Sequence, residues 1–376
     1  MKDILPQIQG VISPITQASL AALQDLKSRL TKTSVKPEVN LAPSVRLACD
    51  FGRSKIAFLE IEKLQNEITV TRFHKVSRPK ENDKVVEILK ECFAAGKFVT
   101  PKVRLSVKGQ GVVIRFVQFP KMKPEDLRGA ITFEAEKYIP FKYNEVVLDF
   151  VVIEDNIQGP SGPMMNVLIV GVKRDEVYPL IQTFQSAGLE VELIDADALA
   201  FLNAIEFCYP DVMASAIGIL DIGTDISTLS VAQGGNPRFI RDLSFGGMDV
   251  IKRLKRKLGL TDQAAMEQME VDRVPTPEAQ EVLKEALGNL VSDLKVSLDY
   301  YLDQVHGATP ITKLFLAGGG GYHPVVIDAL TKDLQIPVET LDVLGKVKTV
   351  EGLDLELFKK NQGLLTVALG LALRDL

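Results

Sequence analysis

The stretch AIGILDIGTDISTLSVAQGG, residues 216–235, contains an apolar run, an Asp-Ile-Gly turn and a second run of alternating residues. Two such runs joined by a short glycine-containing turn predict a β-hairpin. The tip of this hairpin carries one carboxylate, Asp221, and one glycine, Gly223. Aspartate and glycine are common turn residues, so a single copy of the pattern indicates a turn and no more.

The same design occurs 171 residues earlier (221 minus 50), in VRLACDFGRSKIAFLEIEK, residues 45–63. Asp50 and Gly52 take the places of Asp221 and Gly223 in this second stretch. The recurrence predicts a fold built from two related halves, each of which presents an acidic hairpin.

A run of four glycines, Gly318–Gly321, follows an apolar strand late in the chain. Taken alone, it fits a tight turn without a ligand as well as a binding loop. Together with the two hairpins, in this order, it indicates a nucleotide site in which glycine N–H groups face phosphate oxygens. In such a site Asp50 and Asp221 would hold a magnesium ion through water, and Thr224 and Thr228 would add hydroxyl donors.

Composition narrows the classes of function. The chain has 376 residues, 46% of them apolar, enough for two domains or one large α/β body. A net charge of -5 argues against a nucleic-acid surface over the whole molecule, and the basic run at 252–257 has the spacing of a solvated helix face. The three cysteines and three histidines lack ligand spacing and a neighbouring nucleophile, which leaves zinc, disulfides and Ser/His/Asp catalysis unsupported.

Residues 1–44 differ from the rest of the chain. Apolar residues recur at three- and four-residue steps from Ile12 to Leu30, which predicts an amphipathic helix followed by a polar linker. A helix docked on its own protein and a helix that binds a partner or a membrane surface both fit this pattern. No apolar run approaches the roughly 18 residues of a membrane span and no signal peptide is recognisable, so a cytoplasmic location is expected.

Residues 101–183 are expected to form a compact α+β unit. The segments VRLSVKG and GVVIRFVQF predict strands. Pro124, followed by two acidic residues, predicts the start of a helix that stops at Pro140. Leu127, Ile131 and Tyr138 should face inward from that helix.

The ordered set DFGRSK, DIGTDIST and LAGGGG resembles the two phosphate motifs and the adenosine motif of the actin-like ATPase superfamily. More closely, residues 45–376 resemble the family of type IV pilus assembly proteins PilM. The most specific segments are AITFEAEKYIPFKYNEVVLDF, VLIVGVKRDEV, AGLEVELIDADALAFLNA, SFGGMDV, SLDYYL and GLLTVALGLALRDL.

The resemblance implies an α/β, actin-like (ribonuclease H-like) fold of duplicated domains with an inserted small α+β subdomain. The expected divisions are an N-terminal helix and linker at 1–44, a first half at 45–100 and 184–214 joined by 355–376, the inserted subdomain at 101–183, and a second half at 215–354.

The resemblance also implies a function. A PilM-like protein would be a cytoplasmic scaffold at the inner membrane that binds the N-terminal peptide of a PilN-like protein in a groove between the inserted subdomain and the body. Pilus motor ATPases and further copies in a homo-oligomer or ring would be its other partners, with no nucleic acid. Candidate groove residues are Phe133, Tyr138 and Phe141, for each of which a core position is an equal expectation.

The family's nucleotide site maps onto residues of all three motifs. They are Asp50, Gly52, Ser54, Lys55, Asp221, Gly223, Thr224, Thr228, Gly318, Gly319 and Gly320. The first motif departs from the family, because Arg53 and Ala57 stand where a hydroxyl residue and a lysine are usual. The helix that would contact the ribose and base departs as well, with Met266 and Met269 at its polar positions.

These departures leave binding of ATP with magnesium open and make weak or absent hydrolysis the expectation. No catalytic residue can be named from the sequence. The alternatives to a scaffold are a working actin-like ATPase and a membrane-tethered filament protein of the cell-division type.

Overall fold

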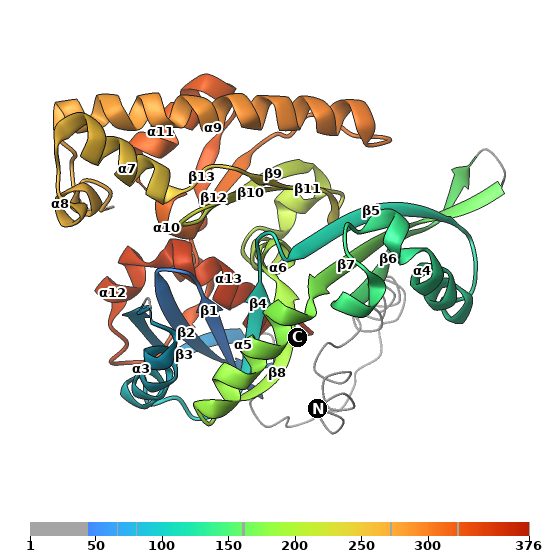
Figure 1. The fold of residues 1–376 in the computed structure, drawn as a ribbon, viewed down its shortest axis with the longest axis horizontal. Helices are drawn as coiled ribbons and strands as arrows, with labels where there is room; N and C mark the ends of the chain where they lie inside the picture. Colours follow the sequence, from blue (N-terminus) through green and yellow to red (C-terminus); the bar gives the residue numbers. More distant parts are fainter. Residues whose placement is uncertain are drawn as a thin grey trace.

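The computed structural model describes residues 44–375 apart from 66, 80, 160, 161, 271, 272 and 322. The helix expected between Ile12 and Leu30 lies outside these residues. Two sheets form the body, and a third sheet belongs to a subdomain that projects from its side (Figure 1).

The six-stranded sheet of the first half has the order β14-β3-β2-β1-β4-β8. Its central hairpin is the predicted one, with Asp50 opposite Ala57 in an antiparallel register. The strands are β1 (Ser44–Phe51), β2 (Lys55–Leu64), β3 (Glu67–Ser77), β4 (Lys102–Val107), β8 (Glu190–Ala196) and β14 (Lys348–Thr349).

Both faces of this sheet are covered, because alternate residues of its central strands enter different cores. Leu47 and Cys49 pack with α3 (Asn82–Ala95) and α5 (Arg174–Ser186). Ala48 packs on the opposite face, against the core that contains residues of α6 (Asp197–Cys208) and α13 (Gln362–Leu373).

The second half contains a five-stranded sheet of order β11-β10-β9-β12-β13. The hairpin predicted at 216–235 forms its β9 and β10, with Asp221 opposite Thr228. The strands are β9 (Ala216–Ile222), β10 (Ser227–Gln233), β11 (Asn236–Leu243), β12 (Leu314–Ala317) and β13 (Val338–Thr340). The helices are α7 (Gly247–Leu258), α8 (Asp262–Glu267), α9 (Pro277–Gln304), α10 (Gly318–Gly321) and α11 (Pro324–Leu334).

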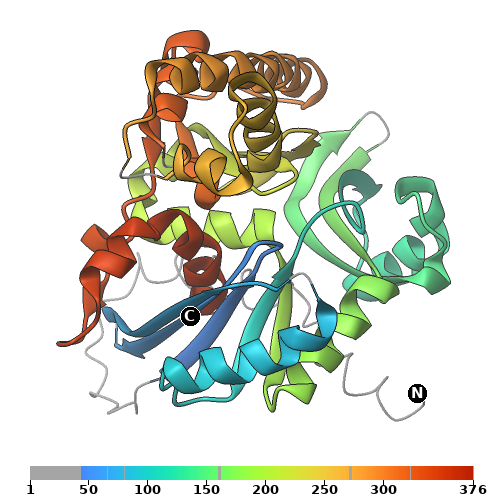
Figure 2. The same ribbon diagram turned by 60° about the vertical axis from the view of Figure 1, so that its left-hand side comes forward.

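One core joins the two halves. Ile219 and Phe315 of the second sheet share a buried cluster with Leu59 of the first sheet and with residues of α6 and α13. Figures 1 and 2 show α13 between the blue strands of the first half and the orange helices of the second. The helix α12 (Leu355–Lys360) precedes it, and short 3-10 turns occur at Tyr143–Glu145, Pro210–Ala214 and Leu344–Lys346.

The inserted subdomain is smaller than expected. It consists of a sheet of order β5-β7-β6 with the helix α4 (Pro124–Tyr138); the strands are β5 (Val112–Pro120), β6 (Val146–Gly159) and β7 (Gly162–Lys173). Proline begins α4, and Leu127 and Ile131 are buried as predicted, while Tyr138 is half-buried.

The expected boundary of the subdomain at 101–183 differs from the structure at both ends. Strand β4 lies in the body sheet, because Val103 pairs in parallel with Leu47 of β1 and with Val191 of β8. Helix α5 packs Ile181 and Phe184 into the core of the first half. The insertion therefore begins after β4 and ends before α5.

No helix within the described ranges is both long and apolar enough to cross a membrane.

Candidate functional site

A cleft of about 1450 Å³ lies where the ends of strands from the two halves meet. Its walls include both hairpin tips, the glycine run after β12 and the beginnings of α6 and α7. Ten of the predicted nucleotide residues line it, namely Asp50, Gly52, Ser54, Lys55, Asp221, Gly223, Thr224, Gly318, Gly319 and Gly320. The structure thus brings three motifs from distant parts of the sequence to one place.

Thr228 does not belong to this group. It sits in β10 opposite Asp221, but its hydroxyl donates a hydrogen bond to Asp242 Oδ1 at 2.8 Å. In the described part of the chain the lining of the cleft does not include it. The Thr228 side chain therefore joins β10 to the neighbouring strand β11.

The two hairpin tips are in contact across the cleft. Arg53 Nη1 lies 3.3 Å from Asp225 Oδ2, and the hydroxyl oxygens of Ser54 and Thr224 are 3.1 Å apart. The bulk of Arg53 therefore lies along the tips, with 79% of its side chain exposed. The guanidinium of Arg53, which stands where the family has a hydroxyl residue, is thus directed to Asp225.

The beginning of α7 holds the tip of the β9–β10 hairpin by main-chain hydrogen bonds. The N–H groups of Gly247 and Met248 donate to the carbonyls of Gly223 and Thr224, each at 2.9 Å. A Cβ at Gly246 would lie 2.5 Å from the Thr224 carbonyl oxygen, so this close approach requires glycine. The segment SFGGMDV, which sequence reasoning used only for the family resemblance, thus positions the second hairpin.

The glycine run after β12 packs against Asp221 and Ile222 at the end of β9. Gly318 has φ of +76°, and a Cβ there would collide with the Asp221 carboxylate and the main chain of Ile222. Gly319 lies against the ammonium of Lys55. Burial lowers the pKa of Lys55 to about 8, although the neighbouring Asp50 opposes that shift.

A lysine that the sequence analysis did not single out occupies the centre of the acidic residues. Lys108 Nζ lies 2.8 Å from Asp197 Oδ2 and 3.3 Å from Asp221 Oδ2. Burial by itself would lower the pKa of Lys108, but Asp197, Asp221 and Asp50 raise it well above its ordinary value. Burial raises the pKa of Asp50 to about 6, with Lys108 opposing the shift.

One signal could have found Asp197. Asp197 directly follows strand β8, just as Asp50 and Asp221 lie at the carboxyl ends of β1 and β9. The carboxyl ends of neighbouring parallel strands meet at one edge of a sheet, so an acidic residue at such a position is a candidate for the site. The same signal applies to Lys108, which directly follows β4, the strand that pairs in parallel with both β1 and β8.

Two methionines of α8 and the turn after it form part of the cleft wall. Met266 and Met269 both line the cleft. The polar residues between them face elsewhere, since Glu267 pairs with Arg273 at 2.7 Å and the Gln268 side chain accepts from the Thr276 N–H at 3.0 Å. Both methionines thus face the cleft, and their effect on contacts to a nucleotide stays a prediction.

The expected magnesium site at Asp50 and Asp221 does not fit this arrangement. Among the residues that the structure describes, no group of three or more His, Cys, Asp or Glu side chains is placed to hold a metal ion. The Asp221 carboxylate instead faces the ammonium of Lys108. We therefore derive no step through a metal ion.

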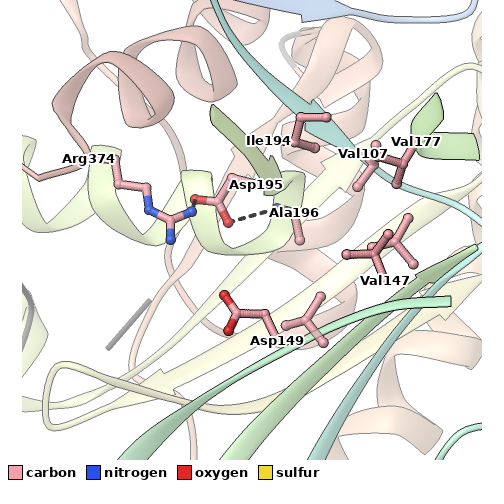
Figure 3. A pocket seen from close by; sticks show the side chains of 10 residues that line it. Val107, Val147, Asp149, Val177, Ile194, Asp195, Ala196 and Arg374 are labelled. Atoms are coloured by element: carbon pink, nitrogen blue, oxygen red, sulfur yellow. Dashed lines mark hydrogen bonds and ion pairs between the residues drawn. The ribbon is translucent and has the colours of Figure 1, made fainter. Parts of the chain in front are cut away.

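A second, much smaller pocket of about 40 Å³ lies between the inserted subdomain and the body (Figure 3). Arg374 Nη1 and Asp195 Oδ2 form a buried ion pair at 2.6 Å beside it, and Asp149 reaches toward them from β6. Burial raises the pKa of Asp195, with Arg374 opposing the shift. The apolar lining consists of Val107, Val147, Val170, Val172, Val177, Ile194 and Ala196.

The three aromatic residues predicted for a peptide groove lie elsewhere on the subdomain. Phe133 projects from α4 with 87% of its surface exposed. Tyr138 packs against Phe119 and donates to Glu134 at 2.9 Å, and Phe141 lies under the Lys173 ammonium. Within the described residues the lining of the small pocket includes none of the three, and their part in peptide binding stays a prediction.

Solved structures share the fold. One, described as the PilM-PilN type IV pilus biogenesis complex, is 24% identical, with 90% of this chain and 99% of that chain covered and a TM-score of 0.78. The ethanolamine utilization protein EutJ from Carboxydothermus hydrogenoformans is 13% identical, with 89% and 91% covered and a TM-score of 0.53. The expected actin-like architecture of two halves with an insertion is thereby confirmed.

The sequence model of type IV pilus assembly protein PilM matches residues 48–376, which include both halves, the insertion and every motif of the cleft. The chain therefore belongs to the PilM family of type IV pilus assembly proteins.

Proposed function

We propose that this chain is a scaffold component of type IV pilus assembly that binds the N-terminal peptide of a PilN-like membrane protein. Membership of the PilM family supports the pilus role, and the similarity to a structure described as a PilM-PilN complex supports the partner. Such a partner would hold the scaffold at the cytoplasmic face of the inner membrane, where motor ATPases and further copies of the chain would assemble on it.

The small pocket at the junction of subdomain and body carries the proposal. Its walls come from β6 and β7 on one side and from β4, β8 and α5 on the other, so an occupant would touch both units. A volume of about 40 Å³ has room for about three water molecules or one short aliphatic side chain. The pocket therefore suits a single anchor residue of a peptide whose remainder lies along the surface.

The polar groups beside the pocket suit the rest of such a peptide. Asp149, Asp195 and Arg374 place charged groups at the edge of an otherwise apolar wall, with Asp195 paired to Arg374. Carboxylates accept hydrogen bonds from main-chain N–H groups, side-chain amides or an amine. The preferred ligand is thus an extended segment with one aliphatic anchor followed by hydrogen-bond donors.

Calorimetric titration with a synthetic N-terminal peptide of the PilN-like protein tests this proposal. Val147→Lys places a charge in the pocket from a half-buried position on β6 and should weaken binding at least tenfold. Val152→Lys is the matched control, because it places the same charge at another half-buried position of β6 outside the pocket, and Phe133→Ala tests the exposed aromatic side chain of α4. Loss of binding with Phe133→Ala and normal binding with Val147→Lys would place the peptide on α4 instead.

A nucleotide in the large cleft is a second candidate function. Its support is the convergence of three glycine-bearing turns with Lys55 in a space large enough for the whole ligand. ATP titration of Lys55→Ala should show at least a tenfold loss of affinity. Lys63→Ala, a change on the same strand away from the cleft, should leave the affinity unchanged. Weak or absent hydrolysis is supported by the two methionines in the cleft wall and by the contacts between the hairpin tips.

A further inference from the structure

We propose that the Lys108 ammonium is the resident cation of the cleft, so that this site accepts a nucleotide phosphate without a divalent metal ion. The phosphate part of this inference rests on the proposed nucleotide site. The cation part rests on the side chains around Lys108 alone, and it can be tested without a nucleotide.

Three buried carboxylates at the cleft carry a charge that has to be balanced. Asp50, Asp197 and Asp221 end or follow three strands and lie almost entirely out of solvent, with exposed fractions of 7%, 5% and 2%. Carboxylates in such a position destabilise the folded protein unless cations or hydrogen bonds compensate them. Many phosphate sites supply this compensation with Mg²⁺, which reaches carboxylates through its bound waters.

A lysine side chain already supplies a cation to these carboxylates. Lys108 spans Asp197 and Asp221 with one ammonium, at 2.8 and 3.3 Å, and is also attracted by Asp50. Its side chain lines the cleft and is 31% exposed. The main chain before it is fixed by the pairing of β4 with both β1 and β8.

A divalent ion would compete with Lys108 for the same carboxylate oxygens. Mg²⁺ at Asp221 would face the ammonium of Lys108 and that of Lys55, and like charges at such short range repel strongly in a poorly solvated site. Two ammonium groups, in contrast, are ordinary phosphate partners. The cleft therefore presents fixed lysine charges to a ligand in place of a metal ion.

The test uses the full chain, Lys108→Met and Lys75→Met. Lys75 is the matched control, because it also lines the cleft but donates to Asn361 Oδ1 at 2.6 Å and not to the acidic group. Binding of Mn²⁺ alone is followed by electron paramagnetic resonance, and thermal unfolding is followed in EDTA and in 5 mM Mn²⁺. ATP affinity is then measured by calorimetry in EDTA and in 5 mM Mg²⁺.

The expected result is that wild type and Lys75→Met neither bind Mn²⁺ nor gain stability from it, whereas Lys108→Met does both. ATP affinity of the wild type should change less than threefold between EDTA and Mg²⁺, and that of Lys108→Met should rise at least tenfold with Mg²⁺. Lys108→Arg, which keeps the charge, should behave as wild type.

Binding of Mn²⁺ by the wild type would overturn the inference, and that measurement remains decisive if Lys108→Met fails to fold. A folded Lys108→Met that ignores Mn²⁺ would overturn it as well, since the carboxylates would then need no cation. If the wild type binds no ATP in either condition, the nucleotide proposal fails and the metal-free phosphate site with it, while the Mn²⁺ result still decides whether Lys108 is the resident cation.

Discussion

The hydroxyl oxygens of Ser54 and Thr224 lie 3.1 Å apart, although 170 residues separate them in the sequence. Beside them Arg53 pairs with Asp225, so two contacts join the tips of the hairpins of the two halves. Both contacts are exposed to solvent, where single hydrogen bonds and ion pairs contribute little free energy. A ligand that needs the tips apart can separate them at small cost.

The ion pair between Arg53 and Asp225 should therefore contribute little to the free energy of unfolding. A double-mutant cycle with Arg53→Ala and Asp225→Ala, measured by urea unfolding, should give a coupling free energy of at most about 1 kcal/mol, because the arginine is largely exposed. Raising NaCl from 50 to 500 mM should reduce it further. A coupling above about 2 kcal/mol would mean that the pair is more shielded than its exposure implies.

ATP binding should lose strength in alkaline buffer. Burial lowers the pKa of Lys55 to about 8, so its ammonium is mostly charged at pH 7 and becomes neutral as the pH rises above 8. Because phosphate binds the charged form, affinity measured by calorimetry should fall by up to tenfold per pH unit above pH 8. Lys55→Arg keeps its charge and should give a flat profile. An equal fall in Lys55→Arg would assign the effect to another group.

Gly370→Ala should destabilise the junction of α13 and α6. A Cβ at Gly370 would run into the carbonyl of Ala200, so the helices would have to move apart. Overpacking of this kind costs about 1–3 kcal/mol in the free energy of unfolding, measured by urea denaturation. Gly129→Ala in α4 is the control, because a Cβ there meets nothing within 4 Å, and helix propensity predicts a gain of up to about 1 kcal/mol. Equal effects of the two changes would contradict the close packing.

Glu60→Gln should weaken the first half from within. The Glu60 carboxylate is fully buried and accepts from Thr71 Oγ1 at 2.8 Å, from Arg72 and from the Val99 N–H at 2.7 Å. The NH2 group of a glutamine at this position would face one of these donors instead of accepting from it. The unsatisfied donors should lower the unfolding free energy by about 1–3 kcal/mol. Glu62→Gln, on the same strand in a half-buried position, should change it by less than about 0.5 kcal/mol. Unfolding curves that coincide would show that the buried charge is dispensable.

His323 should make the protein less stable in mild acid. Burial lowers its pKa below the ordinary 6.5, so the unfolded chain takes up the proton first as the pH falls. The unfolding free energy should then decline from pH 6.5 downward by up to about 1.4 kcal/mol per pH unit, until the native pKa is reached. His323→Asn keeps an acceptor for the Val325 N–H and should remove this part of the slope. An unchanged slope would place the titration elsewhere.

The local elements of this fold were predictable from the sequence because each has its own signal. The alternation around Asp50 and Asp221 predicted both hairpins, and Pro124 predicted the start of α4. Strand β4 was recognisable as a strand, but its assignment to the body was not. Val103 pairs with residues of β1 and β8 that are far away in the sequence, and periodicity does not say which strands become neighbours.

The same limit applies to the sites. The glycine turns and Lys55 belong to motifs with fixed spacing, so their positions in the cleft could be expected. Lys108 reaches Asp197 and Asp221 only because three strand ends meet, and no spacing in the sequence relates these residues. The valines of the junction pocket likewise follow strand alternation, which predicts a buried face but not the surface opposite it.

The position of α13 has a consequence for how the chain folds during synthesis. Its residues are buried against β1, β2 and α6, yet they are translated about 310 residues after β1 ends. At roughly 5–20 residues per second, the ribosome reaches α13 some 15–60 s later. Until then α13 does not cover the face of the first sheet that contains Ala48 and Leu59. An exposed apolar sheet face of this kind attracts other chains. We expect nascent chains stalled before Gln362 to be captured by cellular chaperones, and full-length chains to be released from them.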